Sequence, residues 1–138
     1  MADSFTFELV SPERLVASGE ASIVTVPGSD GDMGVMGNHA PVMTTLRPGV
    51  VQATMTDGSD ASFFVRGGFA DITPQSVTVL AEFALPMSEM TREIFDVQRE
   101  RAQADYDAAH RTNDEAKIAN ARSYLDQLNH LEPTLLPA

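Results

Sequence analysis

Short runs in which apolar and polar side chains alternate fill the first 85 residues, and glycine or proline separates these runs. Alternation puts every second side chain on one face, which is typical of half-buried strands. Many short strands with no helical period between them predict an antiparallel sandwich or a barrel-like pair of sheets. The predicted strands cover 5–10, 15–20, 21–26, 50–55, 62–66, 69–72 and 77–81.

Glycines within these runs predict bends and turns. Gly19 predicts a bulge or bend at which the chain changes direction between the second and third strands. Gly67-Gly68 predicts a break in the strand around it. The pair Asp57-Gly58 lies between two strand-like runs and predicts a hairpin turn.

The pattern changes after residue 86. From Ser88 to His110 glycine and proline are absent, the residues favour helices, and Ser88 or Thr91 can cap the start. Side chains for one helix face recur there at spacings of three and four. The predicted stripe is Met87, Met90, Ile94, Val97, Arg101, Ala104 and Ala108.

A second helix is predicted after the loop and cap Thr112-Asn113-Asp114, and such a short loop makes the two helices an antiparallel hairpin. Alanines dominate the expected seam and Arg101 interrupts it, so we expect a small buried area and a weakly held hairpin. The fold is therefore predicted as α+β, with an N-terminal antiparallel β-sandwich in residues 1–86 and a C-terminal antiparallel two-helix hairpin in residues 87–138. The apolar face of the second helix is predicted as Ile118, Ala121, Leu125 and Leu128.

Charge and composition narrow the function. The 138 residues contain 9 Lys and Arg against 20 Asp and Glu, a net charge of −11, which opposes contact with nucleic acid and with anionic membrane surfaces. Without cysteine there is neither a disulfide nor a Cys-ligated metal site. No apolar run approaches the roughly 18 residues of a spanning helix. We expect no metal, no nucleic-acid partner and no direct membrane insertion, and attachment to a membrane complex only through protein contacts.

Residues 30–51 are the main candidate for a functional surface, because glycines and prolines there turn the chain repeatedly between brief strands. His39 lies at a turn from which its imidazole can reach a partner. A contact site is favoured over a catalytic one, since the sequence pairs no nucleophile with this histidine. Asp30-Gly31-Asp32 lacks the ligand spacing of a calcium loop and indicates an acidic turn.

Two alternatives for these residues stay open. In one, His39 is bonded to the backbone of its own turn and has no further role. In the other, an enzyme uses Asp32, His39 and Asp71, although no paired nucleophile and base accompany them.

Seven short motifs occur in an order and at separations that resemble the epsilon subunits of F-type ATP synthases, which are called delta in mitochondria. Each motif alone is common, but their succession before a predicted helical hairpin is specific. The resemblance covers about residues 5–85 closely and the remainder by architecture. The motifs are Ser11-Pro12-Glu13, Val26-Pro27-Gly28, Gly31-Asp32-Met33-Gly34-Val35, His39-Ala40-Pro41, Leu46-Arg47-Pro48-Gly49-Val50, Val65-Arg66-Gly67-Gly68-Phe69 and Val77-Thr78-Val79-Leu80-Ala81.

The resemblance implies a sandwich of ten strands in a non-catalytic rotor subunit, which couples c-ring rotation to the catalytic head through the gamma subunit. The host would be a proton-translocating synthase, and the subunit, without a cofactor, would lie peripherally at the cytoplasmic face of the bacterial inner membrane. The alternative is a free-standing β-sandwich that binds another protein. The residues implied to contact gamma or the c ring are Asp32, Asn38, His39, Ala40, Met43 and Thr44.

The resemblance also implies that the hairpin can extend toward the alpha and beta subunits and inhibit ATP hydrolysis, and that some relatives bind ATP at its first helix. Asp96 and Arg99 keep two positions of that ATP motif and are the candidate nucleotide-binding residues, but Glu100 replaces its alanine with a negative charge. Six basic residues from Arg92 to Arg122 are balanced against ten acidic ones from Glu89 to Glu132. This balance weakens any inhibition that relies on cations, so we expect a weak or absent inhibitory role.

Overall fold

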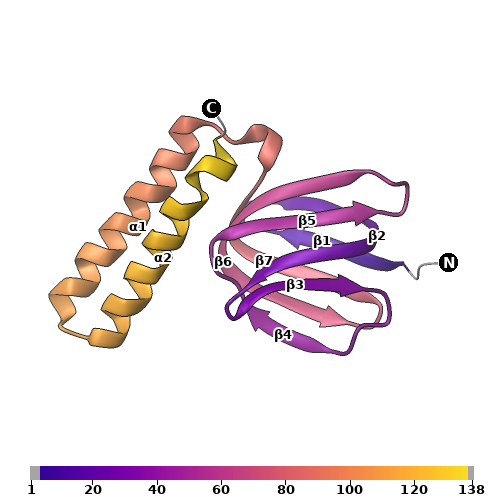
Figure 1. Cartoon of the computed structure of the whole chain (residues 1–138), viewed down its shortest axis with the longest axis horizontal. Coiled ribbons are helices and arrows are strands. Elements are labelled where there is room, and N and C mark those ends of the chain that lie inside the picture. Colours follow the sequence, from indigo (N-terminus) through magenta and orange to yellow (C-terminus); the bar gives the residue numbers. More distant parts are fainter. Residues whose placement is uncertain (1–3, 137–138) are drawn as a thin grey trace. The chain divides into compact units, whose positions relative to one another are not determined.

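The structure is a computed structural model that describes residues 4–136. Contacts divide the chain into two compact units, Met1–Met87 and Ser88–Ala138. The first unit consists of strands and the second of helices (Figure 1), which confirms the predicted α+β class. The division falls where the sequence changes from an alternating to a helical pattern.

The strands of the first unit close into a ring. β1 pairs with both β2 and β7, β7 pairs with β6, β6 with β5, and β5 with β2. β3 extends β2 and β4 extends β6, so these two are edge strands. β1 and β7 run parallel, and the other pairings are antiparallel. The strands are β1 (Phe5–Val10), β2 (Leu15–Gly28), β3 (Gly31–Met36), β4 (Val42–Thr45), β5 (Gly49–Met55), β6 (Asp60–Thr73) and β7 (Ser76–Pro86).

Three long strands pass from one layer of the sandwich to the other. β2 pairs first with β1 and then with β3 and β5, and β6 pairs first with β5 and then with β4. β7 pairs along its first half with β1 and stays paired with β6 over both halves. Counting both halves of β2, β6 and β7 gives five strand segments in each layer. These ten segments correspond to the ten strands that the resemblance implies.

The predicted change of direction at Gly19 is wrong. Residues 15–26 form a single strand, whose pairing with β5 shifts register between Ala21 and Ile23. The bend between layers follows this register shift rather than the glycine. Gly19 meets a packing need instead, since a Cβ there would lie 2.7 Å from the Met55 side chain.

The predicted break at Gly67-Gly68 is also wrong, because β6 continues through it. The two glycines adopt φ values of 66° and 107°, which lets the strand bend while its pairs with β7 continue on both sides. A Cβ on Gly68 would overlap the backbone carbonyl oxygen of Leu80. The site therefore needs glycine for its backbone angle and for the close approach of β7.

Inward side chains of the two layers meet in one core. In β1, Phe5, Phe7 and Leu9 are buried while Thr6 is exposed, as an alternating strand requires. The predicted hairpin turn at Asp57-Gly58 is confirmed between β5 and β6. The remaining large aliphatic core residues are Val24, Val26, Val35, Leu46, Val51, Val65, Ile72, Val77 and Val79.

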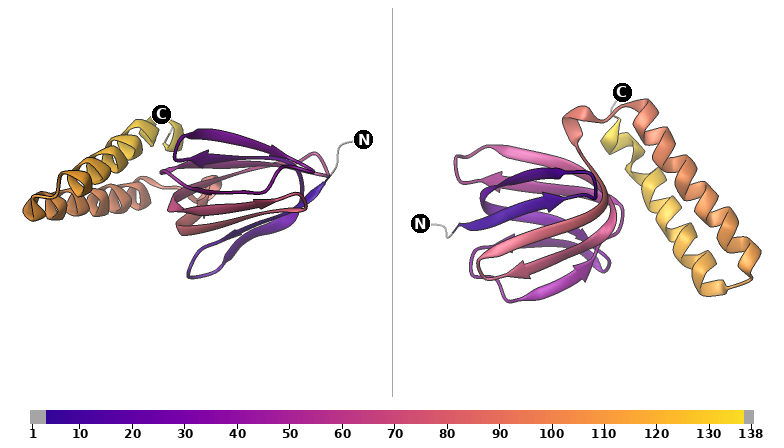
Figure 2. Two further views of the ribbon diagram at one scale, coloured as in Figure 1. Left: turned by 90° about the horizontal axis from the view of Figure 1, so that it is seen from below. Right: turned by 180° about the vertical axis from the view of Figure 1, so that it is seen from behind.

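The second unit contains α1 (Arg92–Thr112) and α2 (Glu115–Leu135), which lie side by side (Figure 2) after a short 3-10 turn, η1 (Met87–Glu89). Of the two predicted caps, Thr91 is the one used, and its hydroxyl accepts a hydrogen bond from the backbone N of Ile94 at 3.2 Å. Asn113 ends α1 in a left-handed conformation, and the Asp114 carboxylate caps α2. The predicted loop and cap are confirmed.

The predicted apolar stripe of α1 is wrong by one position. Its residues Val97, Arg101, Ala104 and Ala108 are exposed, and Arg101 does not interrupt the seam. The predicted stripe begins with Met87 and Met90. These residues precede the helix, so their positions do not indicate which face of α1 is buried. The buried residues of α1 are Phe95, Gln98, Ala102 and Ala109.

The predicted stripe of α2 agrees with the structure. Leu128 is fully buried, and Ile118, Ala121 and Leu125 are half-buried. Leu135 adds a buried side chain in the last turn. The seam of the hairpin is thus thin, as its alanine content suggests.

Candidate functional site

The predicted contact residues lie along the two edge strands, β3 and β4, and the loop 37–41 that joins them. Asn38 takes a positive φ of 60° in this loop, and its backbone N donates to the Pro74 carbonyl oxygen at 3.1 Å. The loop is therefore fastened to the turn between β6 and β7. This bond fixes the position from which Asn38, His39 and Ala40 face outward.

His39 is half-buried and bonded to its own turn. Its Nδ1 lies 2.7 Å from the carbonyl oxygen of Ala40, which can only accept, so Nδ1 carries the proton. The structure therefore contains the hydrogen bond between His39 and its own turn that the first alternative predicted. The bond sets the direction of the ring and leaves Nε2 as the nitrogen that a partner can approach.

Asp32 is not a free acid. Its carboxylate lies 2.7 Å from the guanidinium of Arg47, whose other terminal nitrogen donates to the Gly28 carbonyl oxygen at 3.3 Å. The Asp32 side chain is 66% exposed and that of Arg47 is 30% exposed. Arg47 therefore ties the β2–β3 turn to the chain that follows β4. Arg47 was not among the predicted site residues, although it belongs to the motif Leu46-Arg47-Pro48-Gly49-Val50.

A shallow pocket of about 280 Å³ opens between the β2–β3 turn and β4. It brings Asp32, Met43 and Thr44 together, with Gly28, Met33 and Val42 also in its lining. The loop residues Asn38, His39 and Ala40 are not among the residues that line it. The Met43 side chain is 63% exposed, and an exposed methionine offers adaptable apolar contact to a partner.

An exposed apolar row crosses the outer face of the layer that contains β4, and the sequence analysis missed it. Strand pairing aligns Phe69 of β6 with Leu80 of β7, Leu80 with Val10 of β1, and Val10 with Leu15. Phe69 is 37% exposed, Leu80 38% and Leu15 55%. We call Phe69, Leu80, Val10 and Leu15 the outer row.

The paired positions two residues away along each strand border the outer row with one apolar and several polar side chains. They are Met43 opposite Asp71, then Thr78 and Glu8. The row is therefore continuous with the predicted contact residue Met43 and has two carboxylates beside it. Contiguous exposed apolar groups rimmed by polar ones are typical of a protein-contact surface.

A sequence signal for this row exists. Strands with one solvated face alternate, whereas Leu9-Val10, Phe69-Ala70 and Val79-Leu80-Ala81 place apolar residues on both faces. Such doubled runs indicate a strand that is covered on both sides. In the single chain the core covers one face, and the outer row stays exposed on the other.

The candidate nucleotide residues Asp96 and Arg99 are adjacent on α1 and already engaged by the chain. Arg99 Nη2 lies 3.1 Å from Asp96 Oδ1, and Arg99 Nη1 lies 3.3 Å from Glu132 of α2. The Arg99 guanidinium also lies 5.5 Å from the centre of the Phe95 ring. Both groups thus have partners within the hairpin.

Within residues 4–136, no three His, Asp or Glu side chains cluster closely enough to hold a metal ion. In the same residues, neither helix combines the length and the apolar character that crossing a membrane demands.

Comparison with known proteins gives a consistent family. The model of the ATP synthase delta/epsilon chain, beta-sandwich domain, matches residues 4–87. An ATP synthase epsilon chain of Parvibaculum lavamentivorans is 47% identical over 132 residues, which cover 96% of each chain. One from Mesorhizobium japonicum is 46% identical over 138 residues and covers both chains fully.

Solved structures share the fold at lower identity. A chain in the structure of the Euglena gracilis mitochondrial ATP synthase, OSCP/F1/c-ring, aligns with a TM-score of 0.70 and 22% identity. The alignment covers 96% of the present chain and 81% of that chain. The likeness extends over both the strands and the helices.

Proposed function

Because the chain belongs to the ATP synthase delta/epsilon family, we propose that it is a non-catalytic central-stalk subunit of a proton-translocating F-type ATP synthase. It couples rotation of the c ring to the catalytic head through the gamma subunit. It lies peripherally at the cytoplasmic face of a bacterial inner membrane, held there by protein contacts. The observation that carries the proposal is the outer row, an apolar surface that needs a partner.

The outer row is the surface that packs on gamma. Phe69, Leu80 and Leu15 each keep more than a third of their surface exposed in the single chain. Full burial of one exposed side chain of this kind contributes about 1.5–3 kcal/mol, and the fractions still exposed here supply together about 2–4 kcal/mol, which suffices to centre an interface. The neighbouring carboxylates Glu8 and Asp71 favour basic groups at the border of the partner surface.

The loop 37–41 and the pocket beside it extend this contact toward gamma and the c ring. Asn38, His39 and Ala40 supply polar and small groups at a turn whose position is fixed by the bond to Pro74. Asp32, Met43 and Thr44 line the pocket, which fits a side chain of a partner loop. Torque passes through such a surface by packing, so a rigid shape is the property that function requires.

A non-catalytic role agrees with the chemistry of the polar groups. Asp32 is paired with Arg47, and His39 is bonded to the Ala40 carbonyl oxygen. Neither arrangement presents a base to a nucleophile. The hairpin, with its excess of acidic residues, contributes at most weak regulation through contacts with the alpha and beta subunits.

Gamma binding is tested by Phe69→Glu, which puts a charge into the outer row. The purified chain is mixed with the gamma subunit of the same organism and run on gel filtration, with circular dichroism as a check of folding. Wild type should co-elute with gamma, and Phe69→Glu should not. Ile23→Glu is the matched control, because Ile23 is 42% exposed on a strand segment of the other layer. If wild type, Phe69→Glu and Ile23→Glu all co-elute with gamma, the outer row is not the gamma-binding surface.

Coupling is tested in the assembled synthase with Met43→Glu. Membrane vesicles that carry this variant should hydrolyse ATP while pumping fewer protons per ATP than wild type. Thr56→Glu, an exposed change in the distant β5–β6 loop, serves as control and should pump normally. Equal pumping ratios in the two variants would exclude Met43 from the coupling surface.

Regulation by the hairpin is tested by deleting residues 88–138 from the complex. We expect a small change in ATP hydrolysis. A large rise would show strong inhibition by the hairpin and would contradict this part of the proposal.

A further inference from the structure

The open end of the hairpin, where α1 begins and α2 ends, carries four charged side chains in one cluster. Arg92, Asp96 and Arg99 follow each other at spacings of four and three on α1, so they lie on one face of the helix. Glu132 comes from the last turn of α2 and lies 40 residues from Arg92 in sequence. We call these four residues the end cluster.

Glu132 is the centre of the end cluster. Its Oε2 lies 2.7 Å from Arg92 Nη1, and its Oε1 lies 3.3 Å from Arg99 Nη1. One carboxylate thus accepts from two guanidinium groups through its two oxygens. Two arginines that converge on one anion form the arrangement that proteins use to bind a phosphate or a carboxylate.

Asp96 completes the charge balance of the end cluster. Its Oδ1 lies 3.1 Å from Arg99 Nη2 and 3.7 Å from Arg92 Nη1. Two positive and two negative side chains therefore neutralise each other within the chain. The Phe95 ring, 5.5 Å from the Arg99 guanidinium, limits the directions that this arginine can take.

The ends of the helices give an independent reason for this pairing. A cation at a helix N-terminus and an anion at a C-terminus each oppose the helix dipole, and Arg92 and Glu132 occupy these two positions. Their mutual contact compensates for both unfavourable placements. The bond to Arg92 accordingly holds the pKa of Glu132 below its ordinary value.

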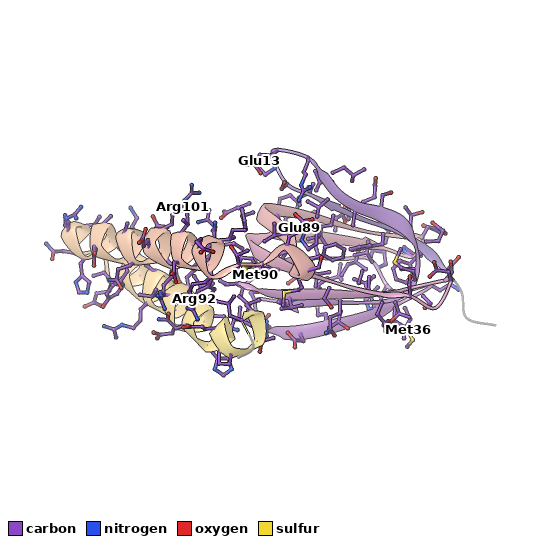
Figure 3. The ribbon with its side chains drawn as sticks, turned by 90° about the horizontal axis from the view of Figure 1, so that it is seen from above. Glu13, Met36, Glu89, Met90, Arg92 and Arg101 are labelled. Atoms are coloured by element: carbon purple, nitrogen blue, oxygen red, sulfur yellow. The ribbon has the colours of Figure 1, made fainter. Side chains whose placement is uncertain are left out.

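The last turn of α2 also needs an anchor. Pro133 lies inside this turn and supplies no backbone N–H, so the turn has fewer hydrogen bonds of its own. Burial of Leu135 and the pairing of Glu132 with α1 help to hold it, together with the hydrogen bond from Leu136 N to the Glu132 carbonyl oxygen at 2.9 Å. Figure 3 labels Arg92 near the start of α1, on the side that α2 occupies.

We propose that Arg92 and Arg99 form an anion-binding pair whose occupant is the chain's own Glu132, which closes the open end of the hairpin and excludes free polyphosphate. A nucleotide or inorganic polyphosphate that approached the pair would have to displace Glu132 and remain beside Asp96. The end cluster is thus a latch between the two helix ends. The proposal does not depend on assembly of the chain into a larger complex.

The test uses the full chain and Glu132→Gln, with Asp126→Asn as a matched control that removes one negative charge elsewhere on α2. Amide hydrogen exchange at Leu135 and Leu136 should quicken roughly two- to fivefold in Glu132→Gln, the size typical of solvent-exposed ion pairs, and stay unchanged in the control. Inorganic tripolyphosphate, titrated by calorimetry at low salt, should bind Glu132→Gln more tightly than wild type or the control.

A second variant distinguishes loss of the Glu132–Arg92 contact from unspecific fraying of the helix end. Arg92→Gln alone should also quicken exchange at the same amides, but it should add nothing in the Glu132→Gln background, because Glu132→Gln already removes the contact to Arg92. Unchanged exchange in Glu132→Gln would show that the carboxylate fastens nothing. Equal affinity of wild type and Glu132→Gln for tripolyphosphate, or no binding by either, would show that Glu132 does not occupy an anion site. Either result overturns the proposal.

Discussion

The two units of this chain have different sources of order. The sandwich is a ring of strands in which residues distant in sequence pair directly, and its core contains three buried phenylalanine and leucine side chains from β1 alone. The hairpin buries two alanines and one glutamine among the four buried residues of α1. The sandwich therefore resists deformation, while the hairpin depends on a few contacts at its seam and its open end.

This difference has a consequence for mechanism. A surface that transmits torque must not yield, and the outer row, which we propose as that surface, lies on strands that are paired on both sides or tied through the ring. A hairpin that regulates by opening must open at small cost, and elements with few buried contacts open most readily. The uneven distribution of packing thus fits the proposed roles of a rigid sandwich and an opening hairpin.

The largest effect is expected from separating the units. A fragment of residues 1–87 should keep its sheet and unfold cooperatively, because it contains the whole of the sandwich core. A fragment of residues 88–138 should melt at a lower temperature and less cooperatively than the sandwich fragment, because the buried residues of α1 are two alanines, one glutamine and a single large apolar side chain. Thermal melting of both fragments, followed by circular dichroism, measures this. A helical fragment as stable as the sandwich fragment would contradict the comparison.

Gly68→Ala should give the largest effect of a single substitution. The new Cβ would overlap the Leu80 carbonyl oxygen and force a residue with φ of 107° into strain, so β6 could not bend beside β7. We expect the free energy of unfolding of the sandwich to fall by about 3 kcal/mol or more. Urea denaturation of the 1–87 fragment and of the full chain provides the measurement.

Gly34→Ala is the control for this substitution. Gly34 lies on the edge strand β3, and a Cβ there would meet no heavy atom within 4 Å. Its effect should stay within about 1 kcal/mol, because glycine in a strand has no packing to lose. Equal losses at positions 34 and 68 would show that the bend does not depend on the second glycine of the pair.

The sequence predicts well what neighbouring residues decide. The turn at Asp57-Gly58 is held by the Asp57 carboxylate, which accepts from Ser59 two residues later. The Thr91 and Asp114 caps likewise bond to backbone two or three residues away. These features are local, so residue types and spacing suffice to find them.

Features that depend on contacts between residues distant in sequence, or on the exact start of an element, could not be predicted. Whether Gly19 or the register shift after Ala21 bends β2 is decided by its partners β1 and β5. Arg47 reaches Asp32 across 15 residues, and Glu132 reaches Arg92 across 40. The stripe of α1 was shifted because the 3-10 turn at Met87–Glu89, which the sequence did not reveal, delays the start of the helix.

A smaller effect, of opposite sign, is expected in the hairpin. Gln98 is buried, and its side-chain oxygen has no hydrogen-bond partner. Gln98→Leu should raise the free energy of unfolding of the hairpin by about 1–3 kcal/mol, because it removes an unsatisfied polar group. Thermal melting followed at the helical signal measures the change.

Gln103→Leu controls for the gain in helix propensity and hydrophobicity. Gln103 is exposed on α1 and donates to Asp107 at 3.1 Å, so this change should shift stability by no more than about 0.5 kcal/mol. If both leucines stabilise equally, the buried amide is not the weak point of the seam.

The smallest expected effect is a change of amide protection with pH that differs between the two units. The pKa of Glu132 is lowered from 4.5, chiefly by its hydrogen bond from Arg92, so its contribution to hairpin stability is present above about pH 4.5 and is lost as the pH falls through its lower folded value. The hydrogen bond from the Ser59 hydroxyl lowers the pKa of Asp57 from 3.8. The contribution of Asp57 to the stability of the β5–β6 turn is therefore also lost as the pH falls. Acidification below pH 4.5 should therefore lower the protection factor of the Leu136 amide first, so that its exchange rate rises relative to the intrinsic rate at the same pH, and this response should be absent in Glu132→Gln. Asp57→Asn should alter only the response of the turn at more acidic pH. Each substitution changes one unit only. A loss of the Leu136 response in Asp57→Asn would therefore contradict the independence of the two units, on which the contrast between sandwich and hairpin depends.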